Sequence, residues 1–573
     1  MPKIAHKPQL SEQTRIGQST PIKTGVFAYS NCDDVYVVWR YAQPLTGCVG
    51  FKLEKMILSD GNKIVTVANR VNFNNADSPI AQISSEVSPF KRFSWTDHGM
   101  PVGTQVKYRV TPIFANGKPQ TATDWSNPVA ITASAGSGFS AYFNRGLLMS
   151  QFMSGYLKEK HEQPADLKQQ FAEGTQAEQQ MKTFLGGAIR KQLLDLLDEA
   201  IKNKLEIYAA LYELSDPELL LRLKQLKGRA HVLLANGTHS TKTPDENALQ
   251  RAQLEREQVD VHDRMIKTGL AHNKFMIICD DSGEPARVWT GSTNWTPTGL
   301  CTQVNNALLI DNKNVAKIFH QHWQQLADAG TVTPKALISS NDIVNSCSVA
   351  KSDVDVWFTR TSDFQEMDAV NELISSAKQG ILFLMFEPGK STMVDSIIAA
   401  QVKNPNLYVH GVISTMEKDQ TDTAHVSLVQ RGDMTVKDLE IVQPEGIQAN
   451  VAHWQSEVTR NKFLATVGYA IVHSKVIVID PFGDNPIVVT GSHNFSASAS
   501  SKNDENLVII RDNAELAKAY AVNIKSVYDH FRFRAFVAEH EFSGNDSLMN
   551  PDFDWQASTF SDDGQREQDF WCS

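Results

Sequence analysis

Two short stretches of this chain carry the same reactive and polar residues in the same order. The shared residues are His272, Lys274, Ser292 and Asn294 in the first stretch, and His473, Lys475, Ser492 and Asn494 in the second. An imidazole can attack phosphorus or carry a proton, while ammonium and amide groups hold anionic oxygens. Two of each around one point would suit a phosphodiester, with one histidine attacking phosphorus and the other protonating the leaving alkoxide.

The spacing of these residues predicts that strands position them. In a strand, residues i and i+2 point the same way, so His272 and Lys274 are expected on one face, as are His473 and Lys475. The Gly-Ser-x-Asn phrase that follows each pair is expected to close a second strand at a tight glycine turn. One stretch alone provides half of a site, so the fold must bring the two stretches face to face.

The segments around the two stretches also repeat. Hydrophobic periodicity predicts the order helix, strand, helix, strand at 188–203, 205–214, 216–228 and 229–237, and the same order at 369–380, 381–389, 393–402 and 406–415. Repeats of this length are whole domains. The sequence therefore predicts two pseudo-symmetric α/β domains of the α-β-α sandwich type, residues 138–345 and 346–540, with the site between them.

The regions on either side of this repeat have different patterns. Residues 1–135 carry short strand-like runs with period-2 alternation, which predicts an all-β sandwich. The placing of Trp39 and Tyr108 in these runs resembles fibronectin type III domains. The small residues at 133–140 predict a linker, and hence a separable module. The acidic tail, 541–573, is rich in aromatic rings that are expected to pack back on the domains.

Composition sets further bounds on the protein. The 573 residues are too many for one core, and no apolar run reaches the roughly 18 residues of a membrane span. The N-terminus lacks the apolar core of a Sec signal peptide, which predicts a soluble protein that is cytoplasmic or exported by another route. Six cysteines without CxxC pairing indicate neither a zinc site nor a disulfide framework. The net charge of −10 argues mildly against nucleic acid as a partner.

The paired His-x-Lys and Gly-Ser-x-Asn phrases resemble the motifs of the phospholipase D superfamily over residues 138–540. That resemblance implies displacement through a phosphohistidine, without a metal or another cofactor. The favoured hypothesis is a phospholipase D that hydrolyses or transphosphatidylates glycerophospholipids at a membrane surface, as a monomer because both half-sites lie in one chain. The alternatives are a nuclease of the same superfamily and a non-catalytic adaptor. Cardiolipin synthases are disfavoured, because they usually carry membrane helices.

The two copies differ at positions that the family pattern makes important. An aspartate is expected after the lysine strand, where Asp480 stands, but the first copy has Cys279 there and Asp280 one residue later. Either Asp280 takes over through a one-residue shift, or the first half does without the aspartate. An acidic residue farther on, Glu505 in the second copy, corresponds to Asn305 in the first.

The resemblance also implies roles for the two histidines. The downstream acid tends to reach across to the opposite imidazole, so Glu505 would orient His272. A neutral imidazole with its N–H given to a carboxylate keeps its other nitrogen for attack, which makes His272 the expected nucleophile. His473, facing Asn305, would then be the general acid. The opposite assignment stays open, because a carboxylate also stabilises imidazolium.

Several further residues are candidates with a structural alternative. The substrate-pocket candidates are Glu213, Glu387, Trp295 and Phe495. The two glutamates could equally cap a helix or form an ion pair, and the two aromatic rings could flank a headgroup or stack on a base. Arg145 and Arg360 are expected to hold the end of a helix or strand. Cys279 and the residues 320–323 (HQHW) are expected to pack in the core rather than react or bind zinc.

Overall fold

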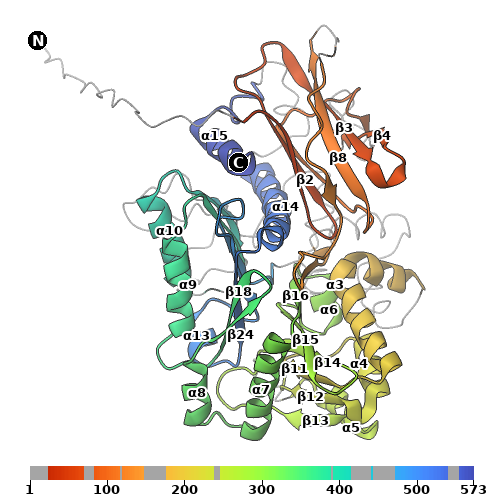
Figure 1. The fold of residues 1–573 in the computed structure, drawn as a ribbon, viewed down its shortest axis with the longest axis vertical. Coiled ribbons are helices and arrows are strands. Elements are labelled where there is room, and N and C mark those ends of the chain that lie inside the picture. The colour runs from red at the N-terminus through yellow and green to blue at the C-terminus, as the bar shows by residue number, and fades with distance from the viewer. Residues whose placement is uncertain are drawn as a thin grey trace, which may run out of the picture.

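The structure is a computed structural model that describes residues 23–69, 83–115, 119, 121–146, 176–237, 245–386, 388, 392–413, 440–442, 472–539 and 554–573. Figure 1 shows a β-rich region at the top and two α/β halves below it. The chain is thus multidomain, as expected from its length.

The described part of the N-terminal region has two larger antiparallel sheets and a two-stranded one, in which β5 (Ala68–Asn69) pairs with β6 (Ile83–Ser84). The strand orders of the two larger sheets are β1 (Gly25–Ser30), β2 (Val35–Arg40), β7 (Ser94–Asp97), and β4 (Lys63–Thr66), β3 (Cys48–Ile57), β8 (Gln105–Phe114), β9 (Val129–Ala130). Trp39, Phe51 and Tyr108 are fully buried in one core that draws on both sheets. The period-2 alternation of the sequence thus supplies the buried face of each sheet.

The first α/β half has a seven-stranded sheet. Its order is β10 (Phe139–Phe143), β16 (Asn306–Asp311), β15 (Pro285–Gly291), β14 (Lys274–Cys279), β11 (Ile207–Leu211), β12 (Ala230–Leu234), β13 (Asp260–Asp263). The last three strands are parallel and the other pairs antiparallel. One face is covered by α3 (Gln176–Asn203), α4 (Pro217–Leu226), α5 (Ala248–Arg256) and α6 (Pro297–Cys301). Helix α4 begins after Asp216, whose carboxylate accepts the amides of Glu218 and Leu219.

The second half has an eight-stranded sheet. Its order is β17 (Asn345–Val349), β18 (Ser352–Phe358), β24 (Asn506–Arg511), β23 (Ile487–Gly491), β22 (Val476–Ile479), β19 (Gly380–Met385), β20 (Tyr408–Ile413), β21 (Glu440–Val442). From β18 onward, the strands follow the same order and directions as in the first half. Helices α9 (Gln365–Ser375) and α10 (Thr392–Lys403) cover one face. The expected boundary at 345/346 falls inside β17.

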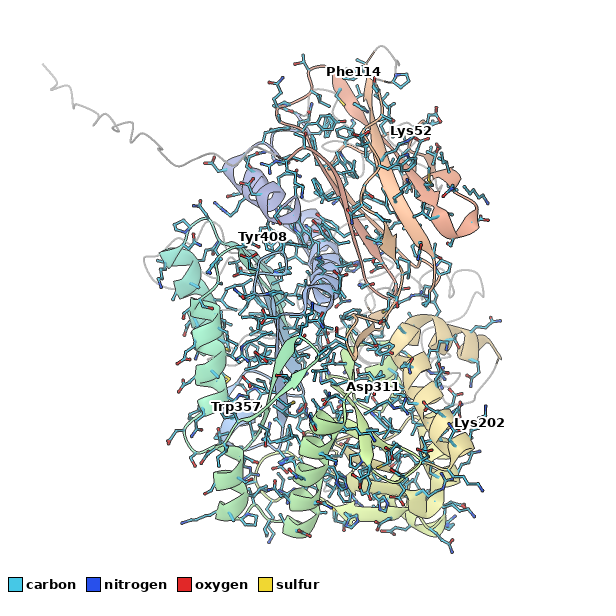
Figure 2. All side chains as sticks on the ribbon, viewed as in Figure 1. Lys52, Phe114, Lys202, Asp311, Trp357 and Tyr408 are labelled. Carbon is cyan, nitrogen blue, oxygen red and sulfur yellow. The ribbon has the colours of Figure 1, made fainter. Side chains whose placement is uncertain are left out.

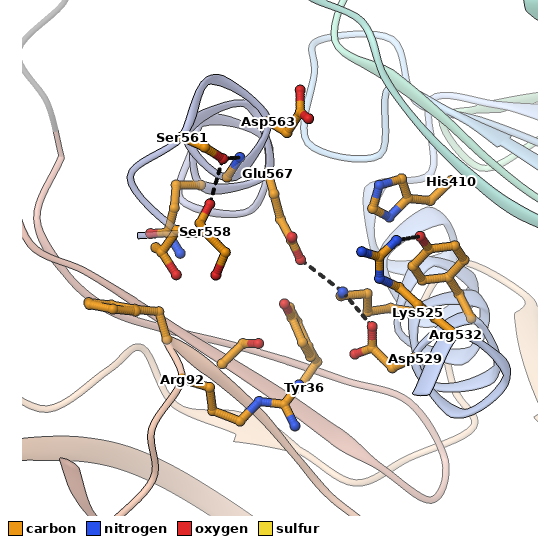
Figure 3. Close-up of a pocket in the computed structure, with 16 residues that line it drawn as sticks. Tyr36, Arg92, His410, Lys525, Asp529, Arg532, Ser558, Ser561, Asp563 and Glu567 are labelled. Atoms are coloured by element: carbon orange, nitrogen blue, oxygen red, sulfur yellow. Dashed lines mark hydrogen bonds and ion pairs between the residues drawn. The ribbon is translucent and has the colours of Figure 1, made fainter. Parts of the chain in front are cut away.

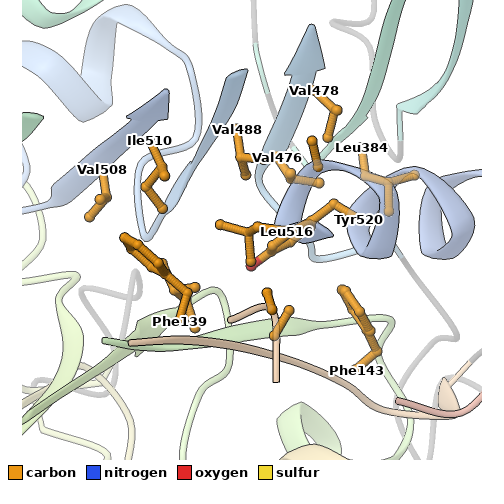
Figure 4. Close-up of a cluster of buried hydrophobic side chains, with 14 of the residues drawn as sticks. Phe139, Phe143, Leu384, Val476, Val478, Val488, Val508, Ile510, Leu516 and Tyr520 are labelled. Atoms are coloured by element: carbon orange, nitrogen blue, oxygen red, sulfur yellow. The ribbon is translucent and has the colours of Figure 1, made fainter. Parts of the chain in front are cut away.

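Two long helices share the largest core of the protein with both α/β sheets. These are α7 (Lys313–Ala329) and α14 (Ala514–Glu539). In Figure 4, Tyr520 and Leu516 of α14 lie between Phe143 of β10 and Val476 of β22. Both faces of the central strands are therefore covered, which explains why their sequences are continuous apolar runs rather than alternating ones.

The small-residue stretch before β10 is a close contact and not a free linker. Strand β10 begins at Phe139, and the carbonyl of Gly138 accepts the amide of Asp311 at 2.8 Å. A Cβ on Gly138 would lie 2.9 Å from the carbonyl oxygen of Asp311, so glycine permits this approach. Asp311 lies where the β-sandwich meets the first half (Figure 2). Cys32 and Tyr36 of the sandwich also belong to the core shared by the two halves. The prediction of a free linker at 133–140 is therefore wrong, while the separability of the sandwich stays a prediction.

The described part of the C-terminal segment, residues 554–573, packs back on the domains as its aromatic content predicts, while residues 541–553 lie outside the described residues. Trp555 packs on the core of the β-sandwich, while Trp571, at the end of α15 (Asp562–Trp571), is fully buried 4.5 Å from Tyr36. Between α15, α14 and the sandwich lies a cavity of about 530 Å³ (Figure 3). Lys525 lines it and bonds Asp529 at 2.7 Å and Glu567 at 2.8 Å. The segment thus joins the sandwich to the second half.

Candidate active site

Each motif histidine is held by the opposite half of the protein. His272 lies just before β14, and its amide donates to the carbonyl of Asp504 at 2.9 Å. His473 lies just before β22, and its amide donates to the carbonyl of Val304 at 2.9 Å. The histidines were expected within strands, but the structure places them in the segments that lead into the strands. Reciprocal backbone bonds between the halves therefore fix both imidazoles.

His272 is paired with a buried carboxylate. Its Nδ1 lies 2.8 and 2.9 Å from the two carboxylate oxygens of Glu505, which is fully buried. Burial raises the pKa of Glu505 to about 7, against the charge of Lys274, which lowers it. An N–H at Nδ1 that points to Glu505 places the lone pair of His272 on Nε2. This is the contact across the halves that was expected from the sequence.

His473 is paired with a neutral amide. Its Nδ1 lies 3.0 Å from Oδ1 of Asn305, whose amide nitrogen donates to the carbonyl of Gly299 at 2.8 Å. Because Asn305 thus presents oxygen, Nδ1 of His473 must be the donor, and its lone pair is on Nε2. Burial, followed by the charges of Lys475 and Lys274, holds the pKa of His473 well below its usual value. The effect of Lys274, a first-half residue, places both motifs in one electrostatic site.

The two lysines take matching positions. Lys274 donates to the carbonyl of His272 at 2.7 Å, and Lys475 donates to that of His473 at 2.6 Å. Both side chains are almost fully buried. Burial lowers the pKa of Lys274 to about 7, against Glu505 and Glu213, which raise it. A bound anion would favour the charged form of such a lysine.

An aromatic ring that was not singled out from the sequence flanks each histidine and lysine. Tyr212 lies 4.9 Å from the ring of His272 and 5.2 Å from Nζ of Lys274. In the second half, Phe386 lies 4.7 Å from the ring of His473 and 4.9 Å from Nζ of Lys475. Both rings follow the matching strands β11 and β19, directly before Glu213 and Glu387. The repeat itself therefore contained the signal for them.

Glu213 reaches the site through an asparagine. Asn294 donates its side-chain amide to the Glu213 carboxylate, whose pKa burial raises to about 6. Of the two roles weighed for Glu213, the structure favours a place beside the site. Asn494 follows β23 as Asn294 follows β15. Glu387 lies outside the described residues.

The glycine and serine of each motif support the backbone. Cβ atoms on Gly291 and Gly491 would lie 2.5 and 2.3 Å from the carbonyl oxygens of Asn306 and Asn506, so neither position has room for a side chain. Ser292 accepts the amide of Asn306 at 3.0 Å, and Ser492 accepts the amide of Asn506 at the same distance. These serines hold the segments that carry Asn305 and Glu505.

The two aspartates after the lysine strands lie away from the histidines. Asp480 follows β22 at the end opposite His473 and accepts the backbone amides of residues 378–380 at 2.7–2.9 Å. Asp280 instead accepts the amides of Ser282 and Glu284 in an exposed turn and pairs with Lys313. A one-residue shift therefore does not give Asp280 the contacts of Asp480. The two aspartates thus contact backbone amides and, for Asp280, Lys313, so any support that they give the site would act through the backbone.

A bulge explains the extra residue between His272 and Gly291. The pairing of β14 with β15 shifts register between Ile278 and Cys279, whereas β22 and β23 pair without a shift. The bulge absorbs one residue. Cys279 is buried, and burial raises the pKa of its thiol to about 12, so the prediction of an unreactive core cysteine is confirmed.

The aromatic residues after the Gly-Ser-x-Asn phrases belong to the core and not to a substrate pocket. Trp295 is fully buried among the side chains between the first sheet and its outer helices, and only its backbone amide reaches Glu213, at 3.2 Å. Phe495 is buried in the matching second-half core. Its left-handed backbone, with φ of 55°, belongs to the turn that directs the ring inward. The expectation that these two rings flank a substrate is wrong.

The remaining candidates have structural contacts. Arg145 pairs with Asp33 of the β-sandwich, and Arg360 donates to the carbonyl of Thr268 at 2.6 Å, so each arginine bridges distant segments instead of holding the end of one element. His322 is buried and stacked 3.7 Å from Phe358, and burial lowers its pKa to about 3. Packing of residues 320–323 is thus confirmed. Within the described ranges, no group of three His, Cys, Asp or Glu residues is arranged to hold a metal.

Comparison with known proteins identifies one matching family model and relatives that match over a short stretch. A family model described as "Cardiolipin synthase, PLD-like domain" matches residues 193–327 and 370–528. A protein named phospholipase D from Rickettsia bellii is 49% identical over 53 residues, which are 9% of this chain and 24% of that protein. A phospholipase D from Rickettsia felis matches to the same extent. The chain thus covers about a quarter of the length of these curated relatives.

Solved structures align only in part. Phosphatidylserine synthase from Haemophilus influenzae aligns with a TM-score of 0.40 and 12% identity, over 60% of this chain and 85% of that one. Nuc from Salmonella typhimurium, a phospholipase D family member, aligns with a TM-score of 0.20 and 20% identity, over 31% of this chain and 96% of that one.

The family match rests on both halves of the chain. Its two segments together cover slightly more than half of the residues and include His272 in one and His473 in the other. In the part of the chain that the structure describes, no helix is both long and apolar enough to cross a membrane. On the strength of the two matched segments, the chain belongs to the PLD-like domain family described under the name of cardiolipin synthase.

Proposed function

We propose that this chain is a phosphodiesterase that acts on glycerophospholipids through a phosphohistidine intermediate. In the first step, Nε2 of His272 attacks phosphorus, the bond to the leaving oxygen breaks, and His473 gives that oxygen a proton. In the second step, His473 takes a proton from water, the water oxygen attacks phosphorus, and the bond to His272 breaks. The observation that carries the proposal is the pairing of His272 with Glu505 and of His473 with Asn305.

The unequal partners of the two histidines support the assignment of roles. When Nε2 of His272 bonds phosphorus, the ring gains positive charge, and the carboxylate of Glu505 at Nδ1 stabilises that charge. His473 has a neutral partner, and burial, followed by the charges of Lys475 and Lys274, holds its pKa low. Once protonated beside a bound phosphodiester, such a histidine gives its proton up readily. His272 is therefore assigned as the nucleophile and His473 as the general acid.

The residues around the histidines would hold the phosphodiester. Lys274 and Lys475 supply positive charge, and Asn294 and Asn494 supply amide donors for the nonbridging oxygens. Preorganised donors at such a centre stabilise the charge that develops in the transition state. The contact of Asn294 with Glu213 would fix the orientation of that amide. Glu505 completes the set through His272.

Three observations favour a lipid substrate over a nucleic acid. The matched family and the Rickettsia relatives carry the names of a cardiolipin synthase and of phospholipase D. The net charge is −10, which disfavours a polyanion. Glu213 also brings a carboxylate close enough to Lys274 for their charges to interact. These observations leave a nuclease and a non-catalytic adaptor as the competing hypotheses.

A substrate panel tests the class of substrate. Purified protein is incubated with vesicles of phosphatidylcholine or phosphatidylethanolamine, and in parallel with plasmid and single-stranded DNA, all with EDTA. The expected result is free headgroup and phosphatidic acid in the presence of the chelator, and no product from His272→Asn. Degraded DNA with intact lipids would establish the nuclease instead, and no product from any substrate would favour the adaptor.

Transfer to an alcohol is the second activity that the intermediate would allow. A phosphohistidine can be opened by an alcohol as well as by water, so added ethanol should give phosphatidylethanol. Its absence from an otherwise active protein would indicate direct hydrolysis. The name of the matched family, which is that of a synthase, favours this test.

The domain organisation is part of the same proposal. We propose a fibronectin type III-like sandwich in residues 1–135, phospholipase D-like domains in 138–345 and 346–540 related by a pseudo-dyad, and a C-terminal segment from 541 to 573. The two larger antiparallel sheets of the described N-terminal residues, with three and four strands, support the first assignment, and the shared strand order supports the second. Because both half-sites lie in one chain, a monomer is expected to be active, which light scattering on active fractions would test.

A further inference from the structure

A buried ion pair joins the two halves beside the proposed nucleophile. Nε of Arg264 lies 2.8 Å from Oδ2 of Asp504, and their side chains are only 2% and 1% exposed. Arg264 directly follows β13 of the first half, and Asp504 directly precedes Glu505 in the second. Such a pair costs desolvation and is weak evidence of a stabilising role, so its location asks for another explanation.

Asp504 holds the backbone around His272. Its carbonyl accepts the amide of His272 at 2.9 Å, and its own amide donates to the carbonyl of Leu270 at 2.8 Å. The next residue, Glu505, places its carboxylate 2.8 Å from Nδ1 of the same histidine. Residues 504 and 505 thus fix both the backbone and the ring of His272.

Arg264 fixes Asp504 to a third segment. Its Nη1 donates to the carbonyls of Gly330 at 2.5 Å and Val332 at 2.6 Å. These carbonyls lie between α7 and α8 (Lys335–Asn341), in the connection from the first half to the second. A planar guanidinium with donors in several directions can hold a carboxylate and two carbonyls at once, whereas a lysine ammonium cannot reproduce that geometry.

The second histidine lacks this arrangement. Val304 occupies the position that matches Asp504, since its carbonyl accepts the amide of His473 and its neighbour Asn305 contacts the imidazole. Valine carries no charge to anchor. The ion pair therefore accompanies only the histidine whose partner is a carboxylate.

We propose that Arg264 is a positioning residue that holds Asp504 and Glu505 in the geometry His272 needs to act as the nucleophile. This inference rests on the proposed function for its catalytic part. Arg264 acts on His272 through Asp504, which it pairs with and whose carbonyl accepts the His272 amide. Its charge also compensates a second buried carboxylate next to Glu505, which would otherwise raise the pKa of both acids.

The charged groups around this pair are known from the structure. Arg264 and Arg360 act on Asp504, while Lys274 and His493 act on Glu505. Tyr212 packs on the ring of His272. Arg264 bonds Asp504 and the carbonyls of Gly330 and Val332. Replacing Arg264 should therefore change the titration of His272, whose amide and imidazole are held by residues 504 and 505.

The test compares Arg264→Met and Arg264→Lys with Arg287→Met. Arg287 is a matched control, because it pairs with Glu199 at 2.8 Å in the same half but is far along β15 from the motif serine. Histidine side chains labelled with ¹⁵N are titrated by NMR, and phosphohistidine formation is followed in single turnovers. With Arg264→Met, the His272 titration should shift, the His473 titration should stay, and adduct formation should slow by about 10- to 100-fold.

Two further variants separate positioning from charge compensation. Arg264→Lys keeps the charge, so it should return the His272 titration toward the wild type but recover only part of the rate. Arg264→Met combined with Asp504→Leu removes both buried charges and should fold stably, yet adduct formation should remain slow. Full recovery of the rate in the double variant would overturn the proposal, because charge compensation alone would then explain it.

The outcomes distinguish this inference from the proposed function. If Arg264→Met leaves the His272 titration and the adduct rate as in Arg287→Met, Arg264 is not a positioning residue. If the wild type forms no phosphohistidine with any phosphodiester, the proposed function fails. The NMR titration would still show whether Arg264 sets the state of His272, since it needs no substrate.

Discussion

The two halves of the protein place the same histidine and lysine at the start of matching strands but give the histidines different partners. His272 faces the carboxylate of Glu505, and His473 faces the amide of Asn305. Two other contacts of the motif are mirrored: each lysine donates to the carbonyl of its own histidine, and each motif serine accepts the amide of the matching asparagine, Asn306 or Asn506. Positions 505 and 305 thus give His272 a carboxylate partner and His473 a neutral amide partner.

The comparison teaches that neither half is complete by itself. Each imidazole takes its partner, and the carbonyl that binds its amide, from the other half. A substitution in one half therefore acts on the histidine of the other half. Changing Asn305 alters the partner of His473, and changing Glu505 alters the partner of His272. The predictions below either remove the difference between the two partners or measure its size.

The largest effect is expected from replacing the histidines. His272→Asn should form no adduct and lose essentially all turnover, because no nucleophile remains. His473→Asn should slow turnover of a phospholipid by about 10²- to 10⁴-fold, since a general acid is lost, yet still form an adduct from a substrate with an activated aryl leaving group. Intact-protein mass spectrometry follows the adduct. A phosphoryl group found on His473 of the wild type would reverse the roles.

The second prediction makes the two pairs alike. Glu505→Gln should reduce adduct formation by about 100-fold, because the charge that develops on His272 loses its carboxylate. Asn305→Ala should slow the reaction less, by about 10-fold, and mainly for substrates with poor leaving groups. Single-turnover rates with aryl and alkyl phosphodiesters measure both. Equal losses in the two variants would show that the partners are not functionally different.

The pH dependence separates the partners as well. Burial raises the pKa of Glu505 to about 7, so the carboxylate form is lost as pH falls through that value. Adduct formation from an aryl substrate should therefore rise between about pH 6 and 8, with a slope that Glu505→Gln removes. A rate profile for the variant with the same rise would assign the titration to another group, such as Lys274.

The smallest effect is expected from the two aspartates after the lysine strands. Asp480→Ala removes the acceptor of three backbone amides and should lower the free energy of unfolding by about 1–3 kcal/mol. Asp280→Ala changes an exposed turn and should leave the urea midpoint unaltered. Adduct formation by folded protein should be normal in both, and a selective loss in Asp480→Ala would give that residue a closer link to the site.

The sequence predicted features that repetition, apolar runs and aromatic content make visible. The helix and strand order of both halves, the aromatic packing of the tail and the buried Cys279 are all found in the structure. The facing of His272 with Glu505 followed only from the resemblance to a family, because nothing local in the sequence links residues so far apart. Glu387 is not described and stays a prediction.

Other features depend on contacts that periodicity does not encode. Trp295 and Phe495 follow catalytic motifs in the sequence, but their turns direct the rings into the core. The small residues at 133–140 look like a linker, yet Gly138 permits a close backbone contact. Tyr212 and Phe386 could have been found by comparing the two copies at the positions before Glu213 and Glu387. Arg264 lies outside the phrases that the two copies share, so comparing those phrases does not draw attention to it.

The packing of Trp571 against Tyr36 has a consequence for how the chain assembles during synthesis. The β-sandwich leaves the ribosome before the two halves, but the surface around Tyr36 is covered by α14 and by residues 554–573, which are translated after every strand of both halves. Domains generally fold as they emerge, so a nascent chain with both histidines in place would still expose this surface. Chaperones and proteases would act on that form until residues 554–573 have been made and have packed on the sandwich.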